Sequence, residues 1–189
     1  EDFVRDALAA GQEVPPHVLA EYPHLNAPSG LSKSLLTIVK AHLPSAVLRQ
    51  RIAAERKRVD LSPTDAEKEA GNYSKGHIPW KGFRIAIENP KGTRRKGKGW
   101  LSPPLPCDYG QFVGEKPGND GDAVDVLIGP HPESEVIFVV NQMKYPDMKE
   151  LDEHKVLVGF RSAREAKAAY LGCYKPGWKC GPIGTITLD

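Results

Sequence analysis

Three aspartates lie within six residues in the segment Asp120-Gly-Asp122-Ala-Val-Asp125, which leads directly into the apolar run 126–128. Carboxylates at this density repel one another, so a folded chain has little reason to gather them unless a cation lies between them. Magnesium is held in proteins by one or two carboxylates together with substrate phosphates and water. The segment therefore predicts a magnesium site that acts on a phosphate compound.

A calcium loop is the first alternative to this interpretation. An EF-hand loop needs an oxygen-bearing side chain at position 5 and an acidic residue at position 12. If Asp120 is position 1, these positions hold Val124 and His131, so the calcium loop is excluded. A surface turn remains an alternative, since Asn-Asp-Gly-Asp is good turn chemistry, but it does not explain Asp125, which lies between two valines.

A second acidic cluster contains Asp147, Asp152 and Glu153, followed by His154 and Lys155. By itself this cluster is typical of a polar hairpin loop, and a histidine beside acidic residues is more often a surface group than a metal ligand. The cluster gains interest because a site for several metals needs carboxylates from more than one segment of the chain.

Cationic residues gather in the segment 91–99, which contains Lys91, Arg94, Arg95 and Lys98. The segment is typical of a solvated loop or of a non-specific nucleic-acid patch. Alternatively it clamps phosphate oxygens, because arginine offers a bidentate fork and lysine a point charge. The pair Tyr174-Lys175 would add a hydroxyl and an ammonium group to the same anion.

The composition is that of an ordinary globular protein, with 189 residues, 40% hydrophobic and 26% charged. The net charge of +2 is too small to indicate nucleic acid by itself. Three cysteines without metal-ligand spacing favour a reduced, cytoplasmic compartment. No apolar run approaches the roughly 18 residues of a membrane span, so no membrane association is expected.

The pattern along the chain changes near residue 77 from helical to strand-like. Helices are expected at 1–25 (two short ones), at 31–59 with a break at Pro44, at 64–69 with Pro63 near the first helical position, and at 162–171 with a capping box of Ser162 and Glu165. Strands are expected at 77–87 (a hairpin), 111–113, 124–128, 136–140 and 156–160. This pattern predicts an α+β fold, a small closed or partly open β-barrel of the OB-like type with flanking helices.

The segment Pro106-Cys-Asp-Tyr109-Gly110, followed by a loop and the acidic hexapeptide, resembles the signature region of soluble family I inorganic pyrophosphatases. The order of the other segments agrees, from 85–90 through Asp147, Asp152 and Lys155 to Tyr174-Lys175. The resemblance covers roughly residues 72–180 and implies a pyrophosphatase-type barrel that hydrolyses pyrophosphate with several magnesium ions.

The resemblance also implies roles for single residues. Asp122 would be the general base, with Lys155 and Tyr174 as further catalytic groups. The metals would be held by Asp120, Asp125, Asp147, Asp152 and Glu88. Pyrophosphate would be bound by Lys91, Arg94, Arg95, Tyr109, Lys155, Tyr174 and Lys175.

The chain departs from the family pattern mainly among the residues that would bind phosphate, and less among those that would bind metal. Leu105 and Gln111 replace tyrosines, Ala123 replaces a proline, and no arginine lies between Arg95 and Cys107. A non-catalytic or altered-substrate module on the same fold, such as a nucleotide phosphohydrolase or a nucleic-acid-binding domain, is therefore the alternative. Nucleic acid is disfavoured because few aromatic residues interleave with the basic ones.

A narrower resemblance concerns the segments 69–77, 87–92 and 152–155, which look like pyrophosphatase-like domains of very large proteins in phages and mobile elements. The segment 14–23 is similar to a short helical unit of such proteins. This resemblance implies the cytoplasm of a bacterium or of a phage-infected host cell. We therefore expect a helical unit at 1–27, a linker and helical segment at 28–70, a pyrophosphatase-like domain at 71–189, and further domains of a polyprotein as partners.

Overall fold

A computed structural model describes residues 45–97, 99–118 and 121–188 of the chain. These residues belong to one compact unit, His42–Asp189. The expected helices at 1–25, the first part of the helix at 31–59, Lys98 and Asp120 lie outside the described residues.

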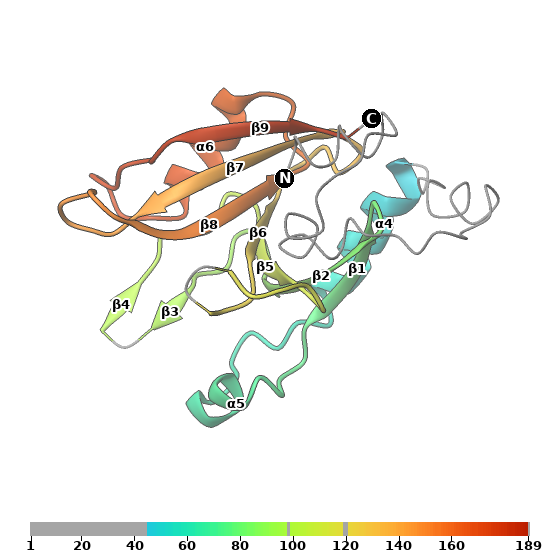
Figure 1. Cartoon of the computed structure of the whole chain (residues 1–189). Helices are drawn as coiled ribbons and strands as arrows, with labels where there is room; N and C mark the ends of the chain where they lie inside the picture. Colours follow the sequence, from blue (N-terminus) through green and yellow to red (C-terminus); the bar gives the residue numbers. More distant parts are fainter. Residues whose placement is uncertain (1–44, 98, 119–120, 189) are drawn as a thin grey trace, which may run out of the picture. The chain divides into compact units, whose positions relative to one another are not determined.

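A mixed sheet of seven strands forms the centre of the described part, in the order β1-β2-β5-β6-β8-β7-β9 (Figure 1). The strands are β1 (Gly76–Trp80), β2 (Phe83–Asn89), β5 (Asp108–Phe112), β6 (Asp125–Ile128), β7 (Val136–Met143), β8 (Leu151–Val158) and β9 (Ile183–Thr187). Neighbouring strands are antiparallel except β6 and β8, which run parallel with Asp125 beside Lys155. A separate hairpin is formed by β3 (Lys96–Gly97) and β4 (Trp100–Leu101).

The predicted α+β class is confirmed. Of the predicted closed or partly open β-barrel, the closed form is wrong for the described residues. The first and last strands in the sheet order, β1 and β9, are edge strands rather than partners of each other. A barrel closes only when its two edges pair, so the sheet is open.

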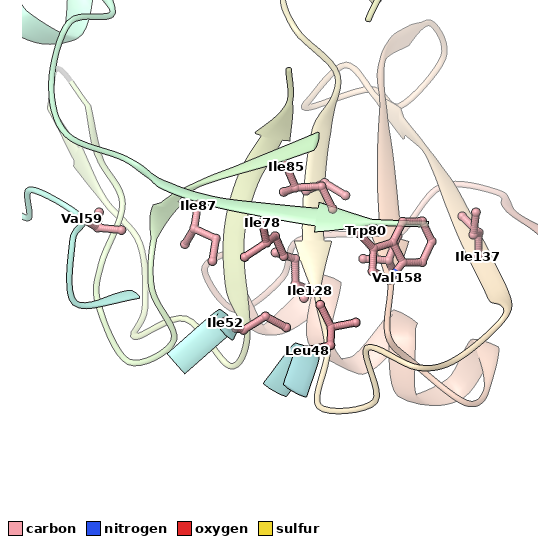
Figure 2. Packing of buried hydrophobic residues seen from close by; sticks show 11 residues of the cluster. Leu48, Ile52, Val59, Ile78, Trp80, Ile85, Ile87, Ile128, Ile137 and Val158 are labelled. Carbon is pink, nitrogen blue, oxygen red and sulfur yellow. The ribbon is translucent and has the colours of Figure 1, made fainter. Parts of the chain in front are cut away.

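Three helices accompany the sheet in the described residues: α4 (Ser45–Arg56), α5 (Asp65–Ala70) and α6 (Ala163–Gly172). In α4, Leu48 and Ile52 are four residues apart and thus share one face, which packs on β1, β6 and β8 (Figure 2). Helix α6 packs Ala166 and Tyr170 into a second cluster with Leu127 and Leu157. Since side chains alternate along a strand, Val126 and Ile128 belong to the first cluster and Leu127 to the second.

Helix α5 contains no buried residue and lies away from the sheet (Figure 1). Its N-cap is Thr64, which forms a capping box with Glu67. Pro63 therefore precedes the cap, and its expected place near the first helical position is wrong. In α6, Ser162 accepts a hydrogen bond from the Glu165 amide as predicted, but the Glu165 carboxylate accepts from the Arg161 amide at 2.9 Å, so only half of the box forms.

Strand boundaries differ from the predicted ones at the acidic segments. β8 begins at Leu151, five residues before the expected start, and therefore contains Asp152, Glu153 and Lys155 rather than leaving them in a loop. Likewise β5 begins at Asp108, so Tyr109 and Gly110 lie within a strand. The strand pairing overrides the polar composition at these positions, because a half-buried strand tolerates polar side chains that find partners.

Candidate phosphate-binding site

A cavity of about 700 Å³ opens between the segment 173–178 that follows α6, the β3–β4 hairpin and the sheet. Four polar groups of its lining carry cations or hydroxyls suited to anions, namely Arg95, Lys155, Tyr174 and Lys175. All four are residues to which the sequence assigned phosphate binding. The lining also contains Glu153 and Gln142 and an aromatic and apolar group made of Trp100, Leu101, Tyr145 and Trp178.

Lys155 is the centre of a buried polar network on one side of this cavity. It is only 2% exposed, and its Nζ donates to the Tyr109 hydroxyl at 2.9 Å, forms an ion pair with Glu153 at 2.6 Å and contacts the Asp125 carboxylate. Parallel pairing of β6 and β8 places Asp125 directly beside Lys155. An isolated buried ammonium is unfavourable, so the carboxylates compensate its charge.

Tyr109 is buried and donates its hydroxyl proton to the Asp125 carboxylate. Burial, to which the negative charge of Asp125 adds, holds the pKa of Tyr109 well above its ordinary value. The phenol is therefore neutral in the ordinary pH range and remains a donor. It fixes the orientation of Asp125.

Arg95 lies with its guanidinium carbon 3.7 Å from the centroid of the Tyr109 ring. Burial by itself would lower the pKa of Arg95, but neighbouring groups, among them the Asp125 carboxylate, raise it. The guanidinium therefore stays charged in the cavity lining, where it can meet an anion.

Gln142 links the carboxylates of the site to its tyrosines through hydrogen bonds. Its amide nitrogen donates to Glu153 at 2.7 Å and to Asp152 at 3.2 Å, and its oxygen accepts from Tyr174 at 2.7 Å and Tyr170 at 3.0 Å. Burial raises the pKa of Tyr170 to about 12 and also raises that of Tyr174. Both phenols thus remain donors, and the network holds Tyr174 at the cavity wall.

Sequence reasoning assigned no role to Gln142, although a signal for its burial existed. Phe138, Val140 and Gln142 are alternate residues of β7, so the apolar face of this strand continues to a polar residue. A glutamine in that position must find partners for both its amide groups. Which partners these are depends on the strand order.

Five further sequence-predicted residues that the structure describes do not line the cavity: Glu88, Arg94, Asp147, Asp122 and Lys91. Glu88 on β2 pairs with Lys75 at 2.5 Å, and Arg94 donates to the Ser102 carbonyl at 2.8 Å. Asp147 is exposed in the β7–β8 connection, and Asp122 is exposed in the β5–β6 connection. Lys91 lines a smaller cavity of about 270 Å³ together with Arg49 and Arg56.

The fit of magnesium to these residues can be judged from the donor set. Among the residues that the structure describes, no group of three or more His, Cys, Asp or Glu is arranged to hold a metal ion. However, Asp125 and Glu153 already share one cation, the Lys155 ammonium, and Asp152 follows in the same network. Magnesium requires only one or two protein carboxylates besides phosphate and water, so the donor chemistry fits.

Two arginines of α4 have carboxylate partners in other segments of the chain. Arg49 pairs with Glu133 at 2.9 Å, and Arg56 pairs with Asp108 at 2.7 Å. No helix in the described ranges is both long and apolar enough to cross a membrane.

Comparison with protein families gives one match. The family described as Inorganic Pyrophosphatase matches residues 65–189, about two thirds of the chain. Searches of curated proteins and of solved structures found no match. The match spans all seven strands of the sheet and every residue of the cavity lining. The chain belongs to the inorganic pyrophosphatase family.

Proposed function

We propose that this protein hydrolyses inorganic pyrophosphate to two phosphates in a magnesium-dependent reaction. The observation that carries the proposal is the cavity in which Arg95, Lys155, Tyr174 and Lys175 meet beside the carboxylates of Asp125 and Glu153. Phosphoryl transfer depends mainly on charge stabilisation and positioning, and this lining supplies both. Family membership supports the same reaction class.

Asp120, Asp125 and Asp152 would hold magnesium, with Asp147 and Glu88 as further oxygen donors. When bound, magnesium supplies positive charge to phosphate oxygens and makes water more acidic. Tyr109 orients Asp125 through its hydroxyl, and Gln142 orients Asp152 through its amide. These contacts come from two different strands, so the acidic side chains stay in place without substrate.

The cations and hydroxyls of the cavity would bind the pyrophosphate itself. Arg95 and Lys175 neutralise its oxygens, and Lys155 and Tyr174 donate to the phosphate that leaves. Asp122, which lies in the exposed β5–β6 connection, would reach the bound pyrophosphate from there and accept a proton from the attacking water while the water oxygen bonds to one phosphorus. The bridging P–O bond breaks, and the second phosphate departs with the electron pair.

Asp122 provides the sharpest test of this mechanism. We expect Asp122→Asn to lower the rate of phosphate release from pyrophosphate by at least about two orders of magnitude, as loss of a positioned base does. The assay measures phosphate release with magnesium chloride, with calcium chloride and with EDTA, and only magnesium should support turnover.

Glu115→Gln is the matched control for Asp122→Asn. Glu115 is an exposed carboxylate in the same β5–β6 connection, so its change to an amide should leave the rate within twofold. Equal thermal unfolding midpoints would show that both variants are folded. A wild-type rate for Asp122→Asn would refute its role as base, and absence of phosphate release by the unaltered chain with magnesium would refute the function.

A further inference from the structure

The cavity has an aromatic side that inorganic pyrophosphate cannot use. Trp100, Leu101 and Tyr145 are 45%, 48% and 68% exposed, and all three line this one cavity. The other exposed large apolar side chains of the described residues, Val47 and Leu61, do not line it. Exposed apolar surface gathered in a concave site marks ligand binding.

Tyr145 is the end of a stack of three parallel rings. It stacks on Trp178 with centroids 5.6 Å apart and 17° between the planes, and Trp178 stacks on Tyr174 at 4.5 Å and 9°. Tyr174 is in turn fixed by its hydrogen bond to Gln142. The stack therefore holds Tyr145 in a defined orientation at low entropic cost, while most of its surface stays open to solvent.

Arg95 joins the aromatic side to the phosphate side. Its guanidinium carbon lies 5.7 Å from the Trp100 ring centroid and 3.7 Å from that of Tyr109, and Tyr109 contacts Lys155 and Asp125. One cavity thus offers exposed ring surface at Trp100 and Tyr145 and, adjoining it, cations for a diphosphate. Its volume of about 700 Å³ lies within the range of sites that bury whole organic ligands.

We propose that the cavity binds a nucleoside diphosphate or triphosphate, with its base against Tyr145 and Trp100 and its phosphates at Arg95, Lys155 and Lys175. This inference rests on the proposed function, because it uses the same phosphate side. Stacking on aromatic rings tolerates any base. The proposal therefore specifies the ligand class, a planar base joined to a diphosphate or triphosphate, and not the identity of the base.

The test compares two non-hydrolysable diphosphates that differ in the nucleoside. α,β-Methylene-ADP and methylenediphosphonate share the P–C–P group, and only the former carries a base. Isothermal titration calorimetry of the full chain with magnesium chloride should show that both compounds bind. The nucleotide analogue should bind at least about tenfold more tightly, a difference that stacking of one base on an aromatic ring can supply.

Tyr145→Ala should then remove the preference. The dissociation constant for α,β-methylene-ADP should rise about tenfold, while that for methylenediphosphonate changes less than twofold. Leu61→Ala, which alters an exposed apolar side chain outside the cavity, should change neither constant.

The outcomes separate the two proposals. Equal affinities of the unaltered chain for the two diphosphates, or an unchanged preference in Tyr145→Ala, would overturn the nucleotide site and leave pyrophosphate hydrolysis standing. If neither diphosphate binds, the cavity cations do not bind phosphate groups, and both proposals are refuted.

Discussion

Asp108 is fully buried at the start of β5 and receives the Arg56 guanidinium in a bidentate pair, with Nε 2.8 and 2.9 Å from its two oxygens. The Lys91 amide donates to the same carboxylate at 2.8 Å. These three segments are far apart in sequence. One carboxylate thus joins α4, β5 and the segment after β2.

We predict that Asp108→Asn lowers the free energy of unfolding by about 2 kcal/mol, because the buried side chain loses its charge-assisted hydrogen bonds to Arg56 and to the Lys91 amide. The loss stays moderate because the Arg56 side chain is 39% exposed and keeps part of its hydration. Urea unfolding followed by circular dichroism measures it. Arg49→Gln, which breaks the solvent-exposed pair with Glu133, is the control and should cost less than about 1 kcal/mol. Equal small effects of the two substitutions would show that Asp108 does not act as a buried ion-pair partner.

At the residue scale, the sequence and the family resemblance pointed to several side chains that the structure places in contact, while their roles stay predictions. The motif around Tyr109 and the acidic run indicated Asp125 and, with the later cluster, Lys155, and the structure brings these three side chains together. Glu153 was noticed but given no role, because its contact with Lys155 follows from strand geometry rather than from composition. Asp120 lies outside the residues that the structure describes.

At the scale of elements, the close approach of β2 and β5 depends on Gly110. A Cβ atom at this position would lie 1.8 Å from the Ala86 carbonyl oxygen, which is backbone and cannot rotate away. The two strands pair here with Ile87 opposite Gly110. Because Gly110 has no side chain, β5 can pair closely with β2, and this pairing fixes the position of Tyr109, the preceding residue of β5.

We predict that Gly110→Ala destabilises the fold by more than about 3 kcal/mol, or prevents folding, because the strands must separate. Gly184→Ala in β9 is the control, since a Cβ there meets only the Val139 carbonyl oxygen at 4.0 Å. Its unfolding midpoint should stay close to that of the unaltered chain. Comparable midpoints for the two variants would contradict the packing argument.

Elements with regular periodicity were predicted well, and their arrangement was not. The hairpin at 77–87 is confirmed as β1 and β2 around Lys81-Gly82, both of which have positive φ as a tight turn requires. Periodicity assigns side chains to faces but does not say which strands are neighbours. The parallel pairing of β6 with β8, which β7 flanks, had no signal in the sequence.

At the scale of the whole molecule, buried tyrosine hydroxyls make the folded state less stable at alkaline pH. Tyr170 is fully buried, and burial raises its pKa to about 12 in the folded chain, against about 10 when unfolded. Its proton is thus bound more tightly in the folded state. The stabilisation is complete below pH 10 and is lost as pH rises from 10 to 12.

We predict that the difference in unfolding free energy between the unaltered chain and Tyr170→Phe is constant from pH 7 to 9. Between pH 10 and 12 it should fall by about 1.4 kcal/mol per pH unit, with the unaltered chain losing more stability. Urea unfolding at one-unit intervals measures both curves. Parallel curves up to pH 12 would contradict the assigned direction of the pKa shift.

The ion pair between Arg56 and Asp108 has a consequence for where this chain can be cut. The family match begins at residue 65, so a fragment trimmed to that limit would lose all of α4. It would uncover the apolar surface that Leu48 and Ile52 shield on β1 and β6, and would leave the Asp108 carboxylate without its guanidinium partner. Expression fragments, domain fusions and recombination breakpoints should therefore keep Ser45–Arg56 with the sheet, although this helix precedes the part that identifies the family.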